Sequence, residues 1–329
     1  MIVGAFDLAE GQFWMRFLGP VVSRFALAAA VALGAAETAS AASGRISIES
    51  GGVKRTAFLV EHARLKQARR PVIVFLHGQS GAGVRVRNRL GLDRALKSRS
   101  VVAVYPDAIG ERWDLSEAGS DRELKFVRDL IAKLEKDGIA DPKRIYIAGG
   151  GPGGILAMRL ACRYGETFAG AASMIALMPA ADAAACKPAK PVGFMLLAGT
   201  ADPKMPYGGG KADIHEFKGE VVSAAATLAP FAAAAGCSEK TTKVDVPDRD
   251  PNDGSRVQLE FRSDCKAPIE LVKIDGGGHT LPGTRPSSDR GQPGGARNGD
   301  IETARLLLGF FKRGRGGWFL ALYPSPWPA

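Results

Sequence analysis

The chain alternates short, continuously apolar runs with segments whose apolar residues recur at the helical period, and this alternation limits the folds open to it. A run that is apolar at nearly every position predicts a strand buried on both faces, as in parallel sheets covered by helices. The clearest helical segments are 121–138 and 301–314. The predicted strands are 71–78, 101–108, 144–150, 169–176, 191–200 and 268–276. The pattern therefore predicts an α/β fold with a mostly parallel central sheet and helices on both faces.

The size and charge of the chain fit one globular domain. Its 329 residues are 46% hydrophobic and 24% charged, which is enough to bury a sizeable core. No repeat or change of composition marks a second domain, so we predict a single domain over 42–314 and a C-terminal tail of unknown role over 315–329. The formal net charge of +10 comes from basic residues spread along the chain, so we expect no nucleic-acid partner.

The N-terminal segment has the parts of a secretory signal peptide. Arg16 and Arg24 precede the apolar run 25–36, and Ala39–Ala41 gives the small-residue pattern of a cleavage site. The apolar run is too short to span a bilayer comfortably, so a permanent anchor is the weaker alternative. We therefore predict a signal peptide over 1–41 and a secreted protein, extracellular or periplasmic, with no permanent membrane span after cleavage.

The first residues of the chain do not fit the start of a signal peptide. Asp7 and Glu10 precede the first basic residue, whereas a signal peptide begins with positive charge. Met15 stands directly before Arg16 and is the more suitable start, so we expect residues 1–14 to be an over-extension of the true start. We expect the mature chain to begin near Ala42.

Four cysteines follow the predicted cleavage site, an even number that suits an oxidising compartment. They form no closely spaced pair of the kind that binds metal, and we expect no metal and no cofactor. Three disulfide pairings are possible, of which the nearest-neighbour one closes the shortest loops; four buried free thiols are the alternative. The cysteines are Cys162, Cys186, Cys237 and Cys265.

Chemically capable residues stand where predicted strands end. His77 closes the first strong strand, a glycine-rich turn over 149–154 closes another, and Asp202 and His279 follow two later ones. Ligands of parallel sheets bind at these strand ends. A strand, a glycine-rich elbow, an Asp and a His, in this order, is the order of an α/β-hydrolase. Asp202 capping a turn and His279 as a structural histidine are the alternatives.

From about Pro71 to Gly283, most of the mature chain resembles the secreted esterases grouped as polyhydroxybutyrate depolymerases and feruloyl-esterase-like enzymes, which are α/β-hydrolases. Two motifs of that family, HGTADPxVPYxGG and GGGHTWPG, stand here with Ala198 and Leu281 as modest departures. The stretches that carry the resemblance are VFLHGQSGAG, VVAVYPDA, DPKRIYIAGG, GGILAMRLACRY, AGTADPKMPYGGG and GGGHTLPG.

The resemblance implies roles for particular residues and an ester, small or polymeric, as substrate. Asp202 would be the orienting acid and His279 the general base. It also favours the pairings Cys162–Cys186 and Cys237–Cys265. The oxyanion loop would contain His77, Gly78 and Gln79, and the substrate cleft would be lined by Trp113 and Tyr207, for which core or rim packing is the alternative.

The chain departs from this family at the nucleophile. The family has G-x-S-N-G-G at the elbow, whereas Gly151 and Pro152 stand here at the serine and the residue after it. The hydroxyl is missing, and so is the backbone N–H that donates to the oxyanion. These losses typically cost about 10⁶-fold in turnover for the nucleophile and about 10² to 10³-fold for the donor.

No nearby serine offers an evident replacement. The sequence has no serine between Ser120 and Ser173, and neither Ser80 nor Ser173 stands on the strand-to-helix turn that aims a nucleophile at its base. A serine at the elbow is held at a strained positive φ, which glycine adopts freely, and proline suits the first helical position. The glycine-rich turn therefore indicates an active site that has lost its catalytic function.

Three hypotheses of different classes remain. The chain is an exported ester hydrolase with impaired catalysis, or a pseudohydrolase that binds an ester, acid or glycan without turnover. The third is a dinucleotide-binding oxidoreductase, because Gly149, Gly151 and Gly154 satisfy G-x-G-x-x-G between a strand and a helix. Against the third stand the mid-chain position of the motif, the amide that Pro152 removes, and a next strand without an adjacent acidic residue.

Overall fold

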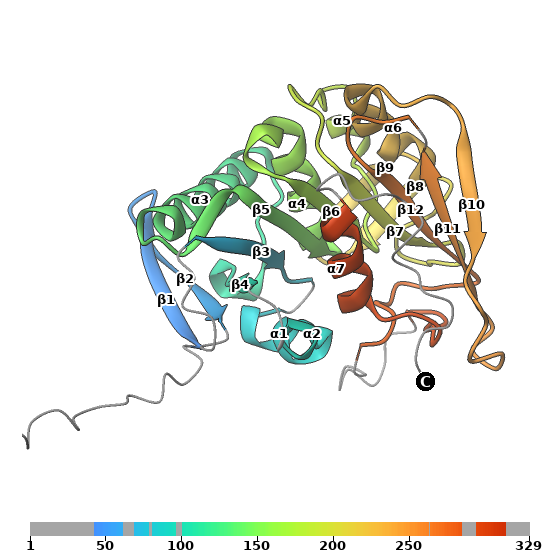
Figure 1. Ribbon diagram of the computed structural model, residues 1–329, viewed down its shortest axis with the longest axis horizontal. Helices are drawn as coiled ribbons and strands as arrows, with labels where there is room; N and C mark the ends of the chain where they lie inside the picture. Colours follow the sequence, from blue (N-terminus) through green and yellow to red (C-terminus); the bar gives the residue numbers. More distant parts are fainter. Residues whose placement is uncertain are drawn as a thin grey trace, which may run out of the picture. The chain divides into compact units, whose positions relative to one another are not determined.

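A computed structural model describes residues 43–61, 69–78, 81–96, 101–262, 264–284 and 294–313 of the chain. The predicted signal peptide, Gln79, Ser80 and the tail over 315–329 lie outside the described residues. The described chain has a ten-stranded sheet in the order β1-β2-β4-β3-β5-β6-β7-β12-β11-β10 and a two-stranded sheet, β8-β9 (Figure 1).

The middle of the large sheet confirms the predicted fold class. Six neighbouring strands pair in parallel, and each coincides with one of the predicted apolar runs. In sheet order they are β4 (Val102–Pro106), β3 (Arg70–Leu76), β5 (Ala140–Gly150), β6 (Gly170–Met174), β7 (Phe194–Gly199) and β12 (Ile269–Asp275).

Antiparallel strands, which the apolar runs did not predict, extend this sheet on both sides. They alternate buried and more exposed residues or are exposed throughout, as all five residues of β10 are. Such strands have no continuous apolar run, so a search for buried parallel strands passes over them. They are β1 (Gly44–Ser50) and β2 (Val53–Val60) on one side, β11 (Arg256–Arg262) and β10 (Thr241–Asp245) on the other, and the separate pair β8 (Gly210–Ile214) and β9 (Phe217–Val221).

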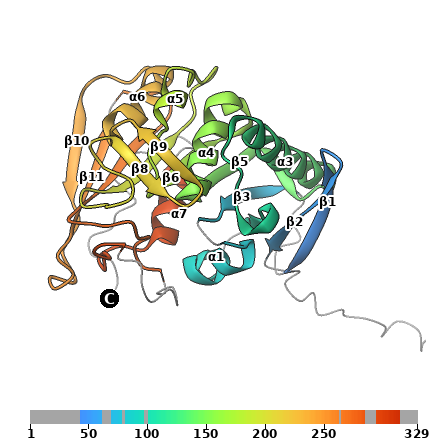
Figure 2. The same cartoon turned by 180° about the vertical axis from the view of Figure 1, so that it is seen from behind.

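The parallel strands bury both faces, as their composition requires. In β3, Val72, Val74 and Leu76 belong to one hydrophobic core, while Ile73 and Phe75 belong to a second core. This alternation follows from the two-residue period of a strand. The first core takes its helical side chains from α3 (Glu117–Lys136), α4 (Pro152–Arg163) and α6 (Ala224–Ala235); the second takes them from α1 (Gly83–Leu90), α2 (Leu92–Leu96) and α7 (Thr303–Arg313) (Figures 1 and 2).

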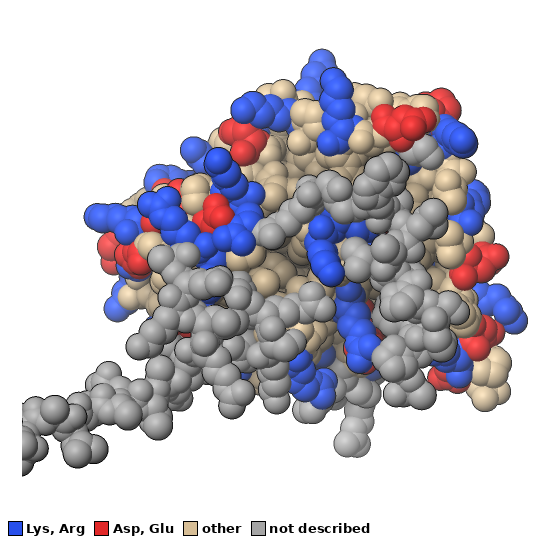
Figure 3. All heavy atoms as spheres, in the orientation of Figure 1, with Lys and Arg blue, Asp and Glu red and all other residues tan. Residues whose placement is uncertain are grey.

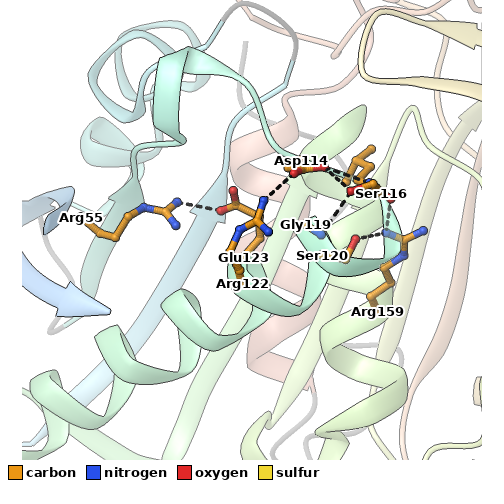
Figure 4. A network of polar contacts seen from close by, with 9 residues as sticks. Arg55, Asp114, Ser116, Gly119, Ser120, Arg122, Glu123 and Arg159 are labelled. Atoms are coloured by element: carbon orange, nitrogen blue, oxygen red, sulfur yellow. Dashed lines mark hydrogen bonds and ion pairs between the residues drawn. The ribbon is translucent and has the colours of Figure 1, made fainter. Parts of the chain in front are cut away.

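The helix that follows the elbow, α4, is fixed to its neighbours by Arg159. The guanidinium donates to Ser120 Oγ in α3 and lies 2.7 Å from Asp182 Oδ2 in the short helix α5 (Ala180–Ala183). On the other flank of α3, Arg55 of β2 lies 2.7 Å from Glu123, with both side chains 4% exposed (Figure 4). These contacts position α4, and therefore the turn before it, against the rest of the fold.

Two disulfides add covalent links on the same side of the sheet. Cys162 in α4 is bonded to Cys186, and Cys237, just after α6, is bonded to Cys265. This is the nearest-neighbour pairing that the resemblance favours. In the chain-entropy model, loops with sequence separations of 24 and 28 stabilise a fold by about 3 to 4 kcal/mol each.

Basic and acidic side chains are interspersed on the face drawn in Figure 3. On α3, Lys125 pairs with Asp129 and Lys133 with Asp137, one helical turn apart. Among the helices of the described chain, none combines the length and hydrophobicity needed to cross a bilayer.

Candidate active site

The turn between β5 and α4 has the backbone of a nucleophile elbow, with Gly151 at its apex. The apex has φ 53° and ψ −123°, a conformation that costs a residue with a side chain on the order of 1 to 3 kcal/mol. Gly151 N–H donates to Met174 O at 2.9 Å, and its carbonyl accepts from Gly154 N–H at 2.8 Å. Pro152 takes the first helical position, where the helix needs no N–H. The turn thus combines this backbone conformation with a residue that has no side chain.

The flanking glycines are required by close packing. A β-carbon on Gly149 would lie 2.1 Å from Gly153 O, and one on Gly153 would lie 2.4 Å from Leu76 O. Any side chain at either position would collide with backbone. The strand, the turn and the helix are therefore in the tight contact that a nucleophile elbow needs.

Asp202 and His279 form a hydrogen-bonded pair. Asp202 follows β7 and His279 follows β12; these strands are parallel neighbours, so both residues emerge at the same edge of the sheet. His279 Nδ1 lies 2.8 Å from Asp202 Oδ2, and the two side chains are 10% and 2% exposed. Asp202 Oδ1 accepts from the N–H groups of Lys204 at 2.8 Å and Met205 at 2.9 Å. The aspartate thus caps its turn with one oxygen and holds the histidine with the other.

The free side of the histidine faces the elbow. A β-carbon on Gly151 would lie 3.9 Å from His279 Nε2, and no other described atom would lie within 4 Å of it. A side chain at position 151 would therefore extend beside the nitrogen that serves as general base in a Ser-His-Asp triad. The described residues thus place Asp202, His279 and position 151 in the order of a Ser-His-Asp triad, with glycine where the triad has serine.

The loop after β3 carries His77 inside the fold. The imidazole is buried, with Nδ1 2.9 Å from Gly78 O and Nε2 accepting from Ala108 N–H at 3.2 Å. Burial lowers the pKa of His77, although the hydrogen bond to Gly78 and the nearby Asp107 oppose this, and a neutral ring suits these two contacts. A β-carbon on Gly78 would lie 3.2 Å from Gly150 O, so the loop runs close to the elbow, where the oxyanion donor of an α/β-hydrolase lies.

Trp113 and Tyr207, the two residues expected at the substrate cleft, differ in how deeply they are buried. Trp113 is 2% exposed; its indole N–H donates to His77 O at 2.9 Å and its ring stacks on the imidazole at 4.7 Å, so it supports the loop from inside. This is the core-packing alternative. Tyr207 is half-buried, its carbonyl accepts from Ala224 N–H at the start of α6, and burial raises the pKa of its phenol. A role for Tyr207 beside a substrate remains a prediction.

Ser173 lies beneath the elbow and its hydroxyl is already engaged. It is fully buried in β6 and donates to Ala176 O at 3.0 Å. A β-carbon on Gly154 would lie 2.8 Å from this hydroxyl, which places Ser173 against the first turn of α4. A buried, committed hydroxyl does not suit a nucleophile.

Two residues beside the elbow were not singled out in the sequence as site residues. Ile175, directly after β6, has φ 48°, a strained conformation for a β-branched residue. A β-carbon on Gly150 would lie 3.5 Å from Leu281, which therefore packs against the turn. Backbone strain cannot be read from the sequence. The position of Leu281, two residues after His279, could have indicated that it lies at the site.

Comparison with known proteins points to esterases. No family model matches the chain. It is 29% identical over 229 residues to NocK of Nocardia uniformis subsp. tsuyamanensis, a protein with an esterase assignment, covering 65% of this chain and 66% of NocK. It is 27% identical over 194 residues to feruloyl esterase B of Piromyces equi, covering 56% of this chain and 34% of that protein. The chain thus spans slightly less than two thirds of one relative and about one third of the other.

A solved structure supports the fold. The acetyl xylan esterase from Aspergillus awamori superposes with a TM-score of 0.52 over 74% of this chain and 96% of that chain. At 12% sequence identity, this similarity concerns the architecture and carries no information on substrate.

Proposed function

We propose that this chain, which is similar to esterases and has the α/β-hydrolase fold, is an exported member of that group that has lost acyl-enzyme chemistry and keeps its site to bind an ester, an acid or a glycan. One observation carries the proposal. Gly151 has the elbow conformation and faces His279 Nε2, but it supplies no hydroxyl.

The missing groups make two contributions to the first step of ester hydrolysis. In the first contribution, a serine hydroxyl gives its proton to the histidine Nε2 while its oxygen bonds to the ester carbonyl carbon. In the second, backbone N–H groups stabilise the oxyanion that forms as the carbonyl π electrons move onto the oxygen. Gly151 removes the first contribution and Pro152 removes one donor of the second, so turnover by this route falls to near background.

Two other candidates are supported less well. Residual hydrolysis by an unconventional route is favoured by the intact contact between Asp202 and His279. Dinucleotide binding is disfavoured because the amide of residue 152 is absent and the turn has the conformation of a nucleophile elbow. Export is supported by the signal-peptide pattern of the sequence and by the two disulfides, which suit an oxidising compartment.

Ester hydrolysis tests the proposal directly. We would assay p-nitrophenyl butyrate with the mature chain from Ala42, with the double variant Gly151→Ser, Pro152→Asn, and with His279→Ala in each background. We expect the parent to match its His279→Ala variant and the double variant to exceed the parent by at least about 10³-fold. Turnover by the parent that His279→Ala abolishes would overturn the proposal.

A further inference from the structure

The loss of the serine leaves one side of a largely buried imidazole without a protein partner. His279 is 10% exposed, its Nδ1 is held by Asp202, and Nε2 has no hydrogen bond within the described chain. Nε2 points at the position that a side chain on Gly151 would occupy, so it is available to a ligand in that space.

A second feature of the same place favours negative charge. Gly151 is the N-cap of α4, a helix of twelve residues, and the N-terminus of a helix carries a partial positive charge. Pro152 removes one N–H donor but leaves the dipoles of the following peptide groups in place. The position therefore adjoins both an imidazole nitrogen and the positive end of a helix.

The contact with Asp202 determines which ligand can bind. The carboxylate accepts a hydrogen bond from Nδ1–H, so in the neutral ring Nε2 carries no proton and presents a lone pair. A carboxylate also lacks a proton, so the two can join only if a proton is taken up and placed on Nε2. The product is an ion pair of imidazolium and carboxylate, stabilised from the other side by Asp202. No bond other than this N–H is formed or broken.

We infer that the space facing Gly151 binds free carboxylic acids, with uptake of one proton by His279. The inference rests on the proposed function, since an active serine would occupy the same space. An ester is bound less well than the carboxylate because it carries no negative charge to pair with the protonated imidazole or with the N-terminus of the helix. The site would thus bind the carboxylic acid of an ester with higher affinity than the ester itself.

Calorimetry with butyrate and methyl butyrate distinguishes the two ligand types. Butyrate would be titrated at pH 8 in Tris and in HEPES, whose different ionisation enthalpies report the protons exchanged. We expect uptake of close to one proton per butyrate and at least tenfold weaker binding of methyl butyrate. His279→Gln should weaken butyrate binding at least tenfold and abolish the uptake. The exposed His215 supplies a matched control, and His215→Gln should change neither quantity.

A second variant tests the role of the tautomer. In Asp202→Asn, the side-chain amide can donate to Nδ1, so that Nε2 carries the proton before the ligand arrives. Butyrate should then bind without proton uptake. ¹⁵N spectra of the four histidines should show Nε2 of His279 becoming protonated with butyrate in the parent chain. Near-ultraviolet circular dichroism would establish that each variant is folded.

The results separate this inference from the proposed function. Butyrate binding without proton uptake in the parent, equal affinity in folded His279→Gln, or no binding at all would overturn the inference. Proton uptake that persists in folded Asp202→Asn would also overturn it. His279-dependent hydrolysis of p-nitrophenyl butyrate by the parent would overturn the proposed function, whatever the calorimetry shows.

Discussion

His279 Nε2 lies 3.9 Å from the position that a β-carbon on Gly151 would occupy, and Gly151 has the φ of 53° found at an elbow apex. Gly151→Ser should therefore place a hydroxyl beside the base and also introduce strain. We expect the variant to lose about 1 to 3 kcal/mol of unfolding free energy, measured in urea. Gly208→Ser is the control, because Gly208 has open space and no positive φ, and it should lose much less. Equal losses in both variants would contradict the strained elbow.

The single variant should also be a poor catalyst. Pro152 still lacks the N–H that donates to the oxyanion, so its turnover of p-nitrophenyl butyrate should remain about 10² to 10³-fold below that of Gly151→Ser, Pro152→Asn. Equal kcat values in the two variants would show that residue 152 contributes no donor.

Asp202→Asn, made in the Gly151→Ser, Pro152→Asn background, tests the orienting role of the acid. One oxygen remains to accept from the N–H groups of Lys204 and Met205, so the turn should persist. The histidine would take the wrong tautomer, and we expect kcat to fall by about 10⁴-fold, as in serine proteases. A folded variant with unchanged kcat would exclude Asp202 from the acid–base pair.

The buried pair of Arg55 and Glu123 predicts a pH-dependent loss of stability. Burial raises the pKa of Glu123, and Arg55 opposes that rise. Arg55→Leu leaves a buried carboxylate without its partner and should cost about 3 to 5 kcal/mol at pH 7. Because the raised pKa of the folded state lets the carboxyl bind a proton more readily than in the unfolded chain, the loss should shrink as the pH falls through that pKa.

Urea unfolding at pH 7 and at pH 5 would measure this effect. The double variant Arg55→Leu, Glu123→Leu is the control, since it removes both charges; it should be more stable than Arg55→Leu and should lack this pH dependence. If the loss in Arg55→Leu were the same at both pH values, Glu123 would not be the source.

The disulfide between α4 and the segment after α5 should support the elbow helix. Cys162→Ala with Cys186→Ala should lower the free energy of unfolding by about 3 kcal/mol, because the unfolded chain regains the freedom of a loop with a sequence separation of 24. Urea midpoints with and without a reductant would measure it, with Cys237 and Cys265 kept as the internal comparison. An unchanged midpoint in the variant would show that this bond adds no stability.

The sequence by itself determined the parallel sheet and the identity of the missing groups. Continuous apolar runs can be satisfied only by burial on both faces, so all six central strands could be predicted. The antiparallel strands could not, because a strand such as β10 is exposed at every position, has no continuous apolar run and pairs with a neighbouring strand. The absence of a hydroxyl at position 151 and of an N–H at position 152 follows from the covalent structure of glycine and proline, so both can be known without the fold.

Only the tertiary structure decided which of these residues meet. Asp202 and His279 are 77 residues apart, and their contact exists because β7 and β12 are parallel neighbours that end at one edge. The inward position of Trp113 and the strained φ of Ile175 likewise depend on packing between distant segments. Local sequence encodes propensity and covalent chemistry, whereas distances between side chains are set by the packing of the whole chain, and the chemistry of this site depends on those distances.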